Sequence, residues 1–196
     1  MKASHRLLVE RRWPSQRRVG EKLVKAKLAD TASLPAGTEA DHEAWRMDMS
    51  WVTGRIAVGG GIWNPQNMLE VKRSGVTHII DMQIEFDDTR LAEPHGIEVL
   101  WNPIDDDFQP KSPEVFQRGT GFALKALDRE GTKLFIHCAA GVHRAPMMAL
   151  ALLCSLGWKL KDGMKLIEAR RPVVDFADVY VRSVERFIER QVRAGK

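Results

Sequence analysis

The chain has 196 residues, of which 44% are hydrophobic and 29% are charged, and its net charge is +4. These proportions are those of a soluble globular domain. The longest apolar run, near Met147–Leu153, is too short to cross a bilayer, and no apolar signal-peptide core follows Met1, so we expect neither a membrane span nor secretion.

The basic charge is concentrated at the N-terminus. Residues 1–27 hold nine Lys and Arg against Glu10 and Glu21, whereas the rest of the chain holds 21 basic and 24 acidic residues. We therefore expect residues 1–50 to form a basic N-terminal extension and linker, and residues 51–196 to form the folded domain. The extension is either an arm that contacts an acidic partner or a solvated lead-in. No specific nucleic-acid binding is predicted.

Strands and helices are predicted to alternate from about Trp51. The expected strands are 55–58, 76–80, 97–101 and 133–136, and the expected helices are 64–74, 113–131, 145–156, 160–170 and 176–192. Gly59-Gly60-Gly61 lacks the spacing of a dinucleotide-binding loop and is predicted to be a turn. The alternation predicts an α/β fold with a central, mostly parallel sheet flanked by helices.

The most informative segment lies between the strand that ends at Ile136 and the apolar helix that begins at Ala145. It reads His137-Cys138-Ala139-Ala140-Gly141-Val142-His143-Arg144. A loop that leads from such a strand into a helix N-terminus presents backbone N–H groups and the positive end of the helix dipole, which favour an anion. Gly141 lets the backbone curl around that anion, and Arg144 can donate two hydrogen bonds to phosphate oxygens.

Cys138 lies at the start of this loop, in the same positive field. Helix N-termini and neighbouring cations stabilise a thiolate, so Cys138 is predicted to be a nucleophile aimed at the bound oxyanion. The predicted phosphate-binding residues are Ala139, Ala140, Gly141, Val142, His143 and Arg144. Cys154 lies in the apolar helix and is predicted to be inert packing. With two cysteines, both in apolar surroundings, we expect free thiols in a reducing compartment such as the cytoplasm.

The segment resembles the His-Cys-x5-Arg signature of protein tyrosine phosphatases, specifically their small dual-specificity branch. The resemblance extends over about residues 51–192 and includes Arg55–Gly60, Gly75–Ile80 and Arg171-Pro172. It implies a two-step hydrolysis of phosphomonoesters through a phosphocysteine on Cys138, without a metal or another cofactor.

The resemblance also implies a general acid on an upstream loop, typically an aspartate three residues after a proline. Pro103-Ile104-Asp105-Asp106 places this role on Asp106, which would protonate the leaving oxygen and then accept a proton from water. Asp105 and Asp107 flank it, so the choice among the three aspartates stays open. His137 is implied to hold hydrogen bonds that order the loop.

Ala145 departs from the pattern of most relatives, which carry Ser or Thr directly after the arginine. That hydroxyl eases departure of the thiolate, so alanine predicts slower hydrolysis of the phosphocysteine. Ala140, Gly141, Ala145 and Pro146 also resemble the loop of plant-type phosphoglucan phosphatases, although His143 replaces the glycine usual before their arginine.

A protein phosphorylated on Tyr, Ser or Thr is the predicted substrate. A phosphoglucan or phosphoinositide substrate stays open, as does a non-catalytic, phosphate-binding pseudophosphatase. A sulfur-transfer or arsenate-reducing enzyme is disfavoured by Pro103–Asp106 and Arg171-Pro172. The histidines show no metal-ligand spacing, and Cys138 with Cys154 is not a zinc pattern, so no metal site is predicted.

Overall fold

The computed structural model describes residues 47–194. Residues 1–46 lie outside this range, so the contact of the basic extension with an acidic partner stays a prediction. None of the helices in the described range is long and apolar enough to cross a membrane.

A five-stranded sheet forms the centre of the domain, in the order β1-β2-β5-β3-β4. The strands are β1 (Met49–Trp51), β2 (Ile56–Gly59), β3 (His78–Asp81), β4 (Glu98–Trp101) and β5 (Leu134–His137). Strand β1 pairs antiparallel with β2, and the other pairings are parallel. The predicted, mostly parallel sheet is therefore confirmed.

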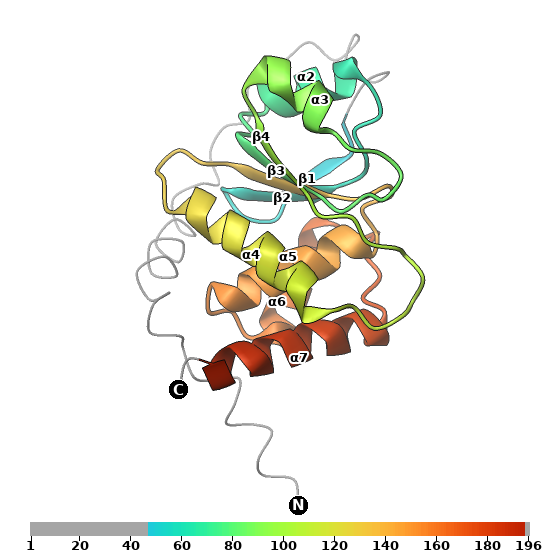
Figure 1. The fold of residues 1–196 in the computed structure, drawn as a ribbon, viewed down its shortest axis with the longest axis vertical. Helices are drawn as coiled ribbons and strands as arrows, with labels where there is room; N and C mark the ends of the chain where they lie inside the picture. The colour runs from blue at the N-terminus through green and yellow to red at the C-terminus, as the bar shows by residue number, and fades with distance from the viewer. Residues whose placement is uncertain (1–46, 195–196) are drawn as a thin grey trace, which may run out of the picture.

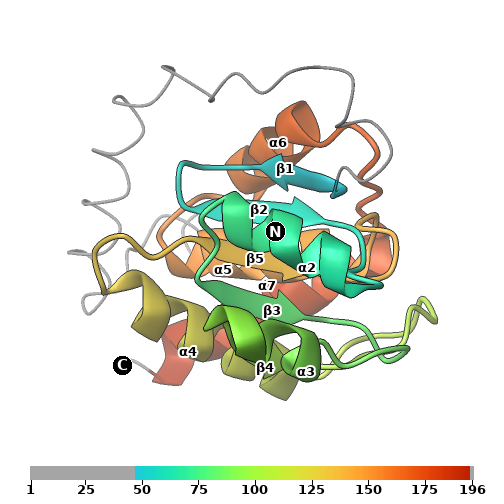
Figure 2. The ribbon, with the colours of Figure 1, turned by 90° about the horizontal axis from the view of Figure 1, so that it is seen from above.

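Helices cover both faces of this sheet (Figures 1 and 2), as the α/β prediction required. One face carries α2 (Pro65–Arg73), α3 (Thr89–Ala92) and the short 3-10 helix η2 (Glu93–His95). The other carries α4 (Pro113–Leu127), α5 (Arg144–Ser155), α6 (Leu160–Arg170) and α7 (Asp178–Ala194).

The sheet divides the core into two hydrophobic clusters because successive strand residues point to opposite faces. Val58 and Ile136 pack toward α4 to α7, whereas Ala57 and Phe135 pack toward α2 and α3. Helix α5 is buried on all sides, with every residue except Cys154 in the buried class. Burying each large apolar side chain contributes about 1.5–3 kcal/mol, so α5 is fixed firmly behind the sheet.

Three short elements were not expected from the sequence, namely β1, α3 and η2. Strand β1 begins at Met49, inside the range expected to be linker, so its first two residues extend the sheet. The prediction that Gly59 belongs to a turn is wrong. Gly59 is the last residue of β2 and pairs with β5 in the sheet. A Cβ atom there would clash with the backbone carbonyl of Asp48, which explains the glycine.

The carboxyl ends of the four parallel strands meet at one edge of the sheet, as the strand arrows in Figure 2 show. The loops that leave this edge contain residues 60–64, 82–88, 102–112 and 138–143. Parallel sheets bind ligands at this edge, so the fold places the predicted anion loop beside three others.

Candidate active site

The anion-binding loop connects β5 to α5, as the sequence predicted. Cys138 is 1% exposed, and its Sγ accepts a hydrogen bond from the N–H of Gly141 at 3.3 Å. Gly141 has φ 64°, in the left-handed region that favours glycine. Cys138 and Cys154 are both free thiols, as expected. Burial raises the pKa of Cys154 to about 12. Cys138 directly follows β5, and α5 begins six residues later at Arg144.

The glycines at the end of β2 and just after it, Gly59 to Gly61, contact this loop through their backbone. The carbonyl of Gly59 accepts from the N–H of Cys138 at 3.4 Å, and the N–H of Gly61 donates to the carbonyl of Ala139 at 3.0 Å. A Cβ atom on Gly141 would clash with the backbone of Gly59. Close approach of the two segments therefore depends on the absence of a side chain at Gly141.

Arg171 holds the loop from the side of α6. Its Nε donates to the carbonyl of Gly141 at 2.8 Å, and its Nη2 donates to the carbonyl of Ala140 at 3.2 Å. The same guanidinium pairs with both carboxylate oxygens of Asp48, at 2.7 and 2.6 Å. With these carbonyls held by Arg171, the backbone N–H groups of the loop other than that of Gly141, which donates to Cys138, can face an anion.

The guanidinium of Arg144 is held by two acceptors that leave part of it unused. Its Nη1 and Nη2 donate to the carboxylate of Glu85 at 2.9 and 2.8 Å, and Nη1 also donates to the carbonyl of Ile104 at 3.2 Å. Arginine has five N–H donors. The N–H on Nε and the second hydrogen of Nη2 are left, and Nε is buried without an acceptor among the described residues. These two donors form the fork that suits a phosphate.

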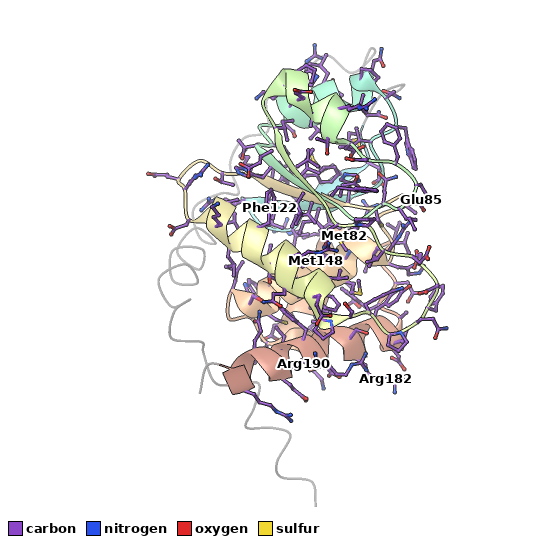
Figure 3. The ribbon with its side chains drawn as sticks, in the orientation of Figure 1. Met82, Glu85, Phe122, Met148, Arg182 and Arg190 are labelled. Carbon is purple, nitrogen blue, oxygen red and sulfur yellow. The ribbon has the colours of Figure 1, made fainter. Side chains whose placement is uncertain are left out.

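Glu85 lies on the loop after β3, at the edge of the molecule where the strands end (Figure 3). The hydrogen bond from Arg144 lowers the pKa of its carboxyl. Burial by itself would lower the pKa of Arg144, but Glu85, Cys138 and Asp106 outweigh it and raise that pKa. The guanidinium therefore stays charged.

The three neighbouring aspartates on the loop after β4 have different surroundings. Asp106 lies beside the anion loop, with Oδ2 3.0 Å from His143 Nδ1 and 3.8 Å from Arg144 Nε. Asp107 forms an ion pair with Lys111, and this contact lowers its pKa. Asp105 is exposed. Of the three, Asp106 is the carboxylate that contacts the anion loop.

Tyr180 of α7 contacts the same aspartate from the other side. Its hydroxyl donates to Asp106 Oδ1 at 2.9 Å and accepts from the N–H of Phe108 at 3.0 Å. Burial is the main cause that raises the pKa of Tyr180 to about 12. The hydroxyl therefore stays a neutral donor at physiological pH.

His137 lies beneath the loop, fully buried between two carboxylates. Its Nε2 is 2.8 Å from Asp88 Oδ2 and 3.8 Å from Asp81 Oδ1. Burial is the main cause that raises the pKa of Asp81 to about 7. These three side chains are close enough to ligate one metal ion. However, Asp81 already accepts the N–H groups of Gln83 and Asp88, so the arrangement is assigned to a buried contact between His137 and two neighbouring carboxyl groups.

The structure thus brings Cys138, the loop residues 139–143, Arg144 and Asp106 together at one edge of the sheet. Sequence reasoning missed Glu85, Tyr180 and the two carboxylates beside His137. Glu85 and Tyr180 lie 59 and 74 residues from their partners, and neither belongs to a local motif. The signals that could have indicated them are weak: Glu85 follows a predicted strand, and Tyr180 lies near the start of a predicted helix.

Comparisons with known proteins agree with this geometry. The family model described as "Dual specificity phosphatase, catalytic domain" matches residues 64–189. Protein tyrosine phosphatase type IVA 2 of Mus musculus is 30% identical over 102 residues, which cover 52% of this chain and 61% of that protein. Protein phosphatase Slingshot homolog 3 of Rattus norvegicus is 25% identical over 131 residues, which cover 65% of this chain and 19% of that protein.

Solved structures show the same fold. PTPMT1 in complex with PI(5)P has a TM-score of 0.67 at 19% identity, over 75% of this chain and 99% of that chain. A mouse putative dual specificity phosphatase complexed with zinc tungstate also has a TM-score of 0.67 at 19% identity, over 82% of this chain and 98% of that chain. At such identities the likeness concerns the fold alone.

Proposed function

Since this chain belongs to the family of dual specificity phosphatase catalytic domains, we propose that it hydrolyses phosphomonoesters with Cys138 as nucleophile. The observation that carries the proposal is the unused fork of Arg144, a buried Nε–H and a second Nη2 hydrogen beside the loop that begins at Cys138. A phosphate dianion matches this fork and the backbone N–H groups of residues 139–143.

In the first step, the Cys138 thiolate attacks phosphorus, and the bond from phosphorus to the leaving oxygen breaks. The leaving oxygen takes a proton from Asp106, and Arg144 stabilises the charge on the phosphoryl oxygens. In the second step, water attacks the phosphocysteine, Asp106 takes its proton, and the thiolate leaves. Phosphate and the free enzyme result.

The proposed substrate is a protein phosphorylated on Tyr, Ser or Thr, as the names of the relatives suggest. The relatives are matched over 61% or less of their own length, so this substrate class is an inference from the domain alone. We also propose a reducing, cytoplasmic compartment, because the nucleophile must stay a thiol. An acidic partner is proposed for the basic extension.

A phosphoinositide is the second candidate substrate, favoured by apolar side chains that are exposed at the end of β4 and on the loops at the same edge of the sheet. They are Trp63, Ile84, Phe86, Trp101 and Phe108, each 40–53% exposed. Large exposed apolar side chains commonly mark binding surfaces, and the acyl part of a lipid would cover them. The PTPMT1 structure holds such a lipid phosphate, PI(5)P.

The test is phosphate release in the presence of a chelator, from an aryl phosphate, phosphotyrosine and phosphothreonine peptides, a phosphoinositide and a phosphorylated glucan. We expect Cys138→Ser to abolish release from every substrate. Asp106→Asn is expected to lower the rate by about 10²–10⁴-fold. The matched controls Asp105→Asn and Asp107→Asn should stay within a few-fold of wild type. Folded protein that releases phosphate from none of the substrates would leave only a phosphate-binding module.

A further inference from the structure

His143 connects the anion loop to two carboxylates on other loops. Its Nδ1 lies 3.0 Å from Asp106 Oδ2, and its Nε2 lies 3.5 Å from Asp175 Oδ2 on the loop before α7. The histidine side chain is 19% exposed, Asp106 is 30% exposed and Asp175 is 68% exposed. One imidazole therefore joins the proposed general acid to a carboxylate that faces solvent.

Two aromatic rings hold this imidazole in place. The Phe108 ring meets His143 edge-on with centroids 5.1 Å apart, and the Tyr180 ring does so at 6.4 Å. Phe108 has φ 54°, a left-handed conformation that is rare for residues other than glycine. Strained backbone of this kind persists where the surrounding contacts fix a functional side chain.

The two oxygens of Asp106 have different partners. Oδ1 accepts from Tyr180, whose raised pKa of about 12 keeps it a donor, and Oδ2 faces His143. Arg144 also approaches Oδ2, with Nε at 3.8 Å, but its guanidinium stays charged. Among these neighbours, histidine is the side chain that ordinarily gains and loses a proton near neutral pH.

We propose that His143 is the proton reservoir of the general acid, a role that rests on the proposed phosphatase function. In its protonated form it donates from Nδ1 to Asp106, and its Nε2 side faces the carboxylate of Asp175. Asp106 touches the leaving group, and His143 supports it by supplying and taking back the proton at Oδ2. Asp175 orients the ring and stabilises its charge.

The proton then moves in a closed cycle. When the phosphorus–oxygen bond breaks, the leaving oxygen takes the proton on Asp106 Oδ2, and His143 Nδ1 returns a proton to Oδ2. Neutral His143 and the phosphocysteine result. When water attacks the phosphocysteine, Asp106 Oδ2 passes its proton to neutral His143 Nδ1 as it takes one from the water, and the Cys138 thiolate leaves. One water molecule is consumed, and the histidine ends protonated as it began.

The experiment compares two aryl phosphates that differ in their need for an acid. Phenyl phosphate releases a weakly acidic phenol and needs a proton, whereas 2,4-dinitrophenyl phosphate releases a strongly acidic one and does not. The measured quantity is the ratio of their kcat/KM values between about pH 5 and 8, the range in which histidine titrates. The kcat/KM value isolates the first step even if hydrolysis of the phosphocysteine limits turnover.

We expect His143→Gln to lower kcat/KM for phenyl phosphate by about tenfold, to leave the dinitrophenyl ester within about twofold, and to flatten the pH dependence of the ratio. Asp175→Asn, an exposed change that preserves folding, should act in the same direction but less strongly. His95→Gln removes a histidine distant from the site and serves as the matched control.

Equal slowing of both substrates by His143→Gln, or an unchanged pH dependence of the ratio, would overturn the inference while the phosphatase function stands. Wild-type protein that hydrolyses neither ester would overturn the proposed function and the inference together. The dissociation constant of vanadate is measured for the His143 variant as a control. An unchanged value shows that the anion loop is intact, so the slower reaction of phenyl phosphate is then due to the missing imidazole and not to misfolding.

Discussion

At the scale of single residues, the carboxylate of Glu85 decides which part of Arg144 can meet a phosphate. The carboxylate of Glu85 accepts one N–H from Nη1 and one from Nη2, and the carbonyl of Ile104 accepts the other N–H of Nη1. The N–H of Nε and the second N–H of Nη2 therefore remain for a phosphate. The orientation of the proposed phosphate clamp is thus set by a side chain 59 residues away in the sequence.

We therefore expect Glu85→Gln to weaken phosphate binding, because an amide offers one acceptor and turns two of its own hydrogens toward the guanidinium. The predicted loss is about three- to tenfold in the dissociation constant of orthovanadate, a modest figure because Glu85 is partly exposed. Asp87→Asn, on the same loop, is the control. Binding that tightens in the Glu85 variant would show that this carboxylate competes with phosphate.

Ala145 is fully buried at the first turn of α5, directly after Arg144. Without a hydroxyl to assist the departing thiolate, we expect the phosphocysteine to accumulate. Rapid-quench kinetics should show a burst of the leaving alcohol, and Ala145→Ser should remove the burst and raise kcat by about tenfold. A wild-type time course without a burst would contradict this prediction.

Asp81 predicts a pH dependence of stability. Its carboxyl pKa rises from 3.8 to about 7 on folding, chiefly through burial, so between these values the folded state holds a proton that the unfolded chain releases. The free energy of unfolding should therefore fall as pH rises through this window, by up to about 1.4 kcal/mol per unit. Urea unfolding at pH 5, 6 and 7 should show a flatter dependence in Asp81→Asn than in wild type or in the exposed control Asp128→Asn.

Among the residues of the site, those that share one continuous segment could be predicted from the sequence. Cys138, Gly141 and Arg144 come from a strand-to-helix loop, and the local chain alone fixes their neighbourhood. The partners Glu85 and Tyr180 could not be predicted, because their positions depend on how the parallel strands order themselves and on where α7 packs.

At the scale of elements, the longer helices were predictable because their start signals are local. Asn64 caps α2 by accepting the N–H of Asn67 at 2.8 Å, and Pro113 begins α4. Strand β1 has only three residues, and its formation depends on pairing with β2. The local sequence pattern does not predict such a short strand. Gly59 was assigned to a turn for the same reason, since it belongs to β2 through its pairing with His137 of β5, far along the chain.

Arg171 joins elements that are distant in the sequence, because one guanidinium holds two carbonyls of the anion loop and Asp48 ahead of β1. It is 3% exposed. Arg171→Gln leaves Asp48 and the carbonyls unpaired, so we expect the free energy of unfolding to fall by about 2–4 kcal/mol. The neighbouring, exposed Arg170→Gln is the control. Chemical denaturation that cannot tell the two variants apart would contradict this role.

At the scale of the whole molecule, the contacts of β1 tie the residues just before residue 51 to the folded domain. Met47, Met49 and Trp51 pack against the cluster between the sheet and α2, and Asp48 pairs with Arg171. The domain predicted from the sequence begins at residue 51 and so excludes three of these four residues. These contacts make residues 47–50 part of the folded domain.

Two shortened chains test this boundary. A chain of residues 47–196 keeps every contact of β1, so we expect its Tm to lie within about 2 °C of the full chain, with kcat/KM for a small aryl phosphate unchanged. A chain of residues 52–196 loses β1 and the partner of Arg171, about 2–4 kcal/mol in sum. For a domain of this size that loss lowers Tm by about 5–15 °C, which circular dichroism would register. Equal Tm values for the two chains would place the boundary at or after residue 51, and a large loss in both would mean that residues 1–46 stabilise the domain.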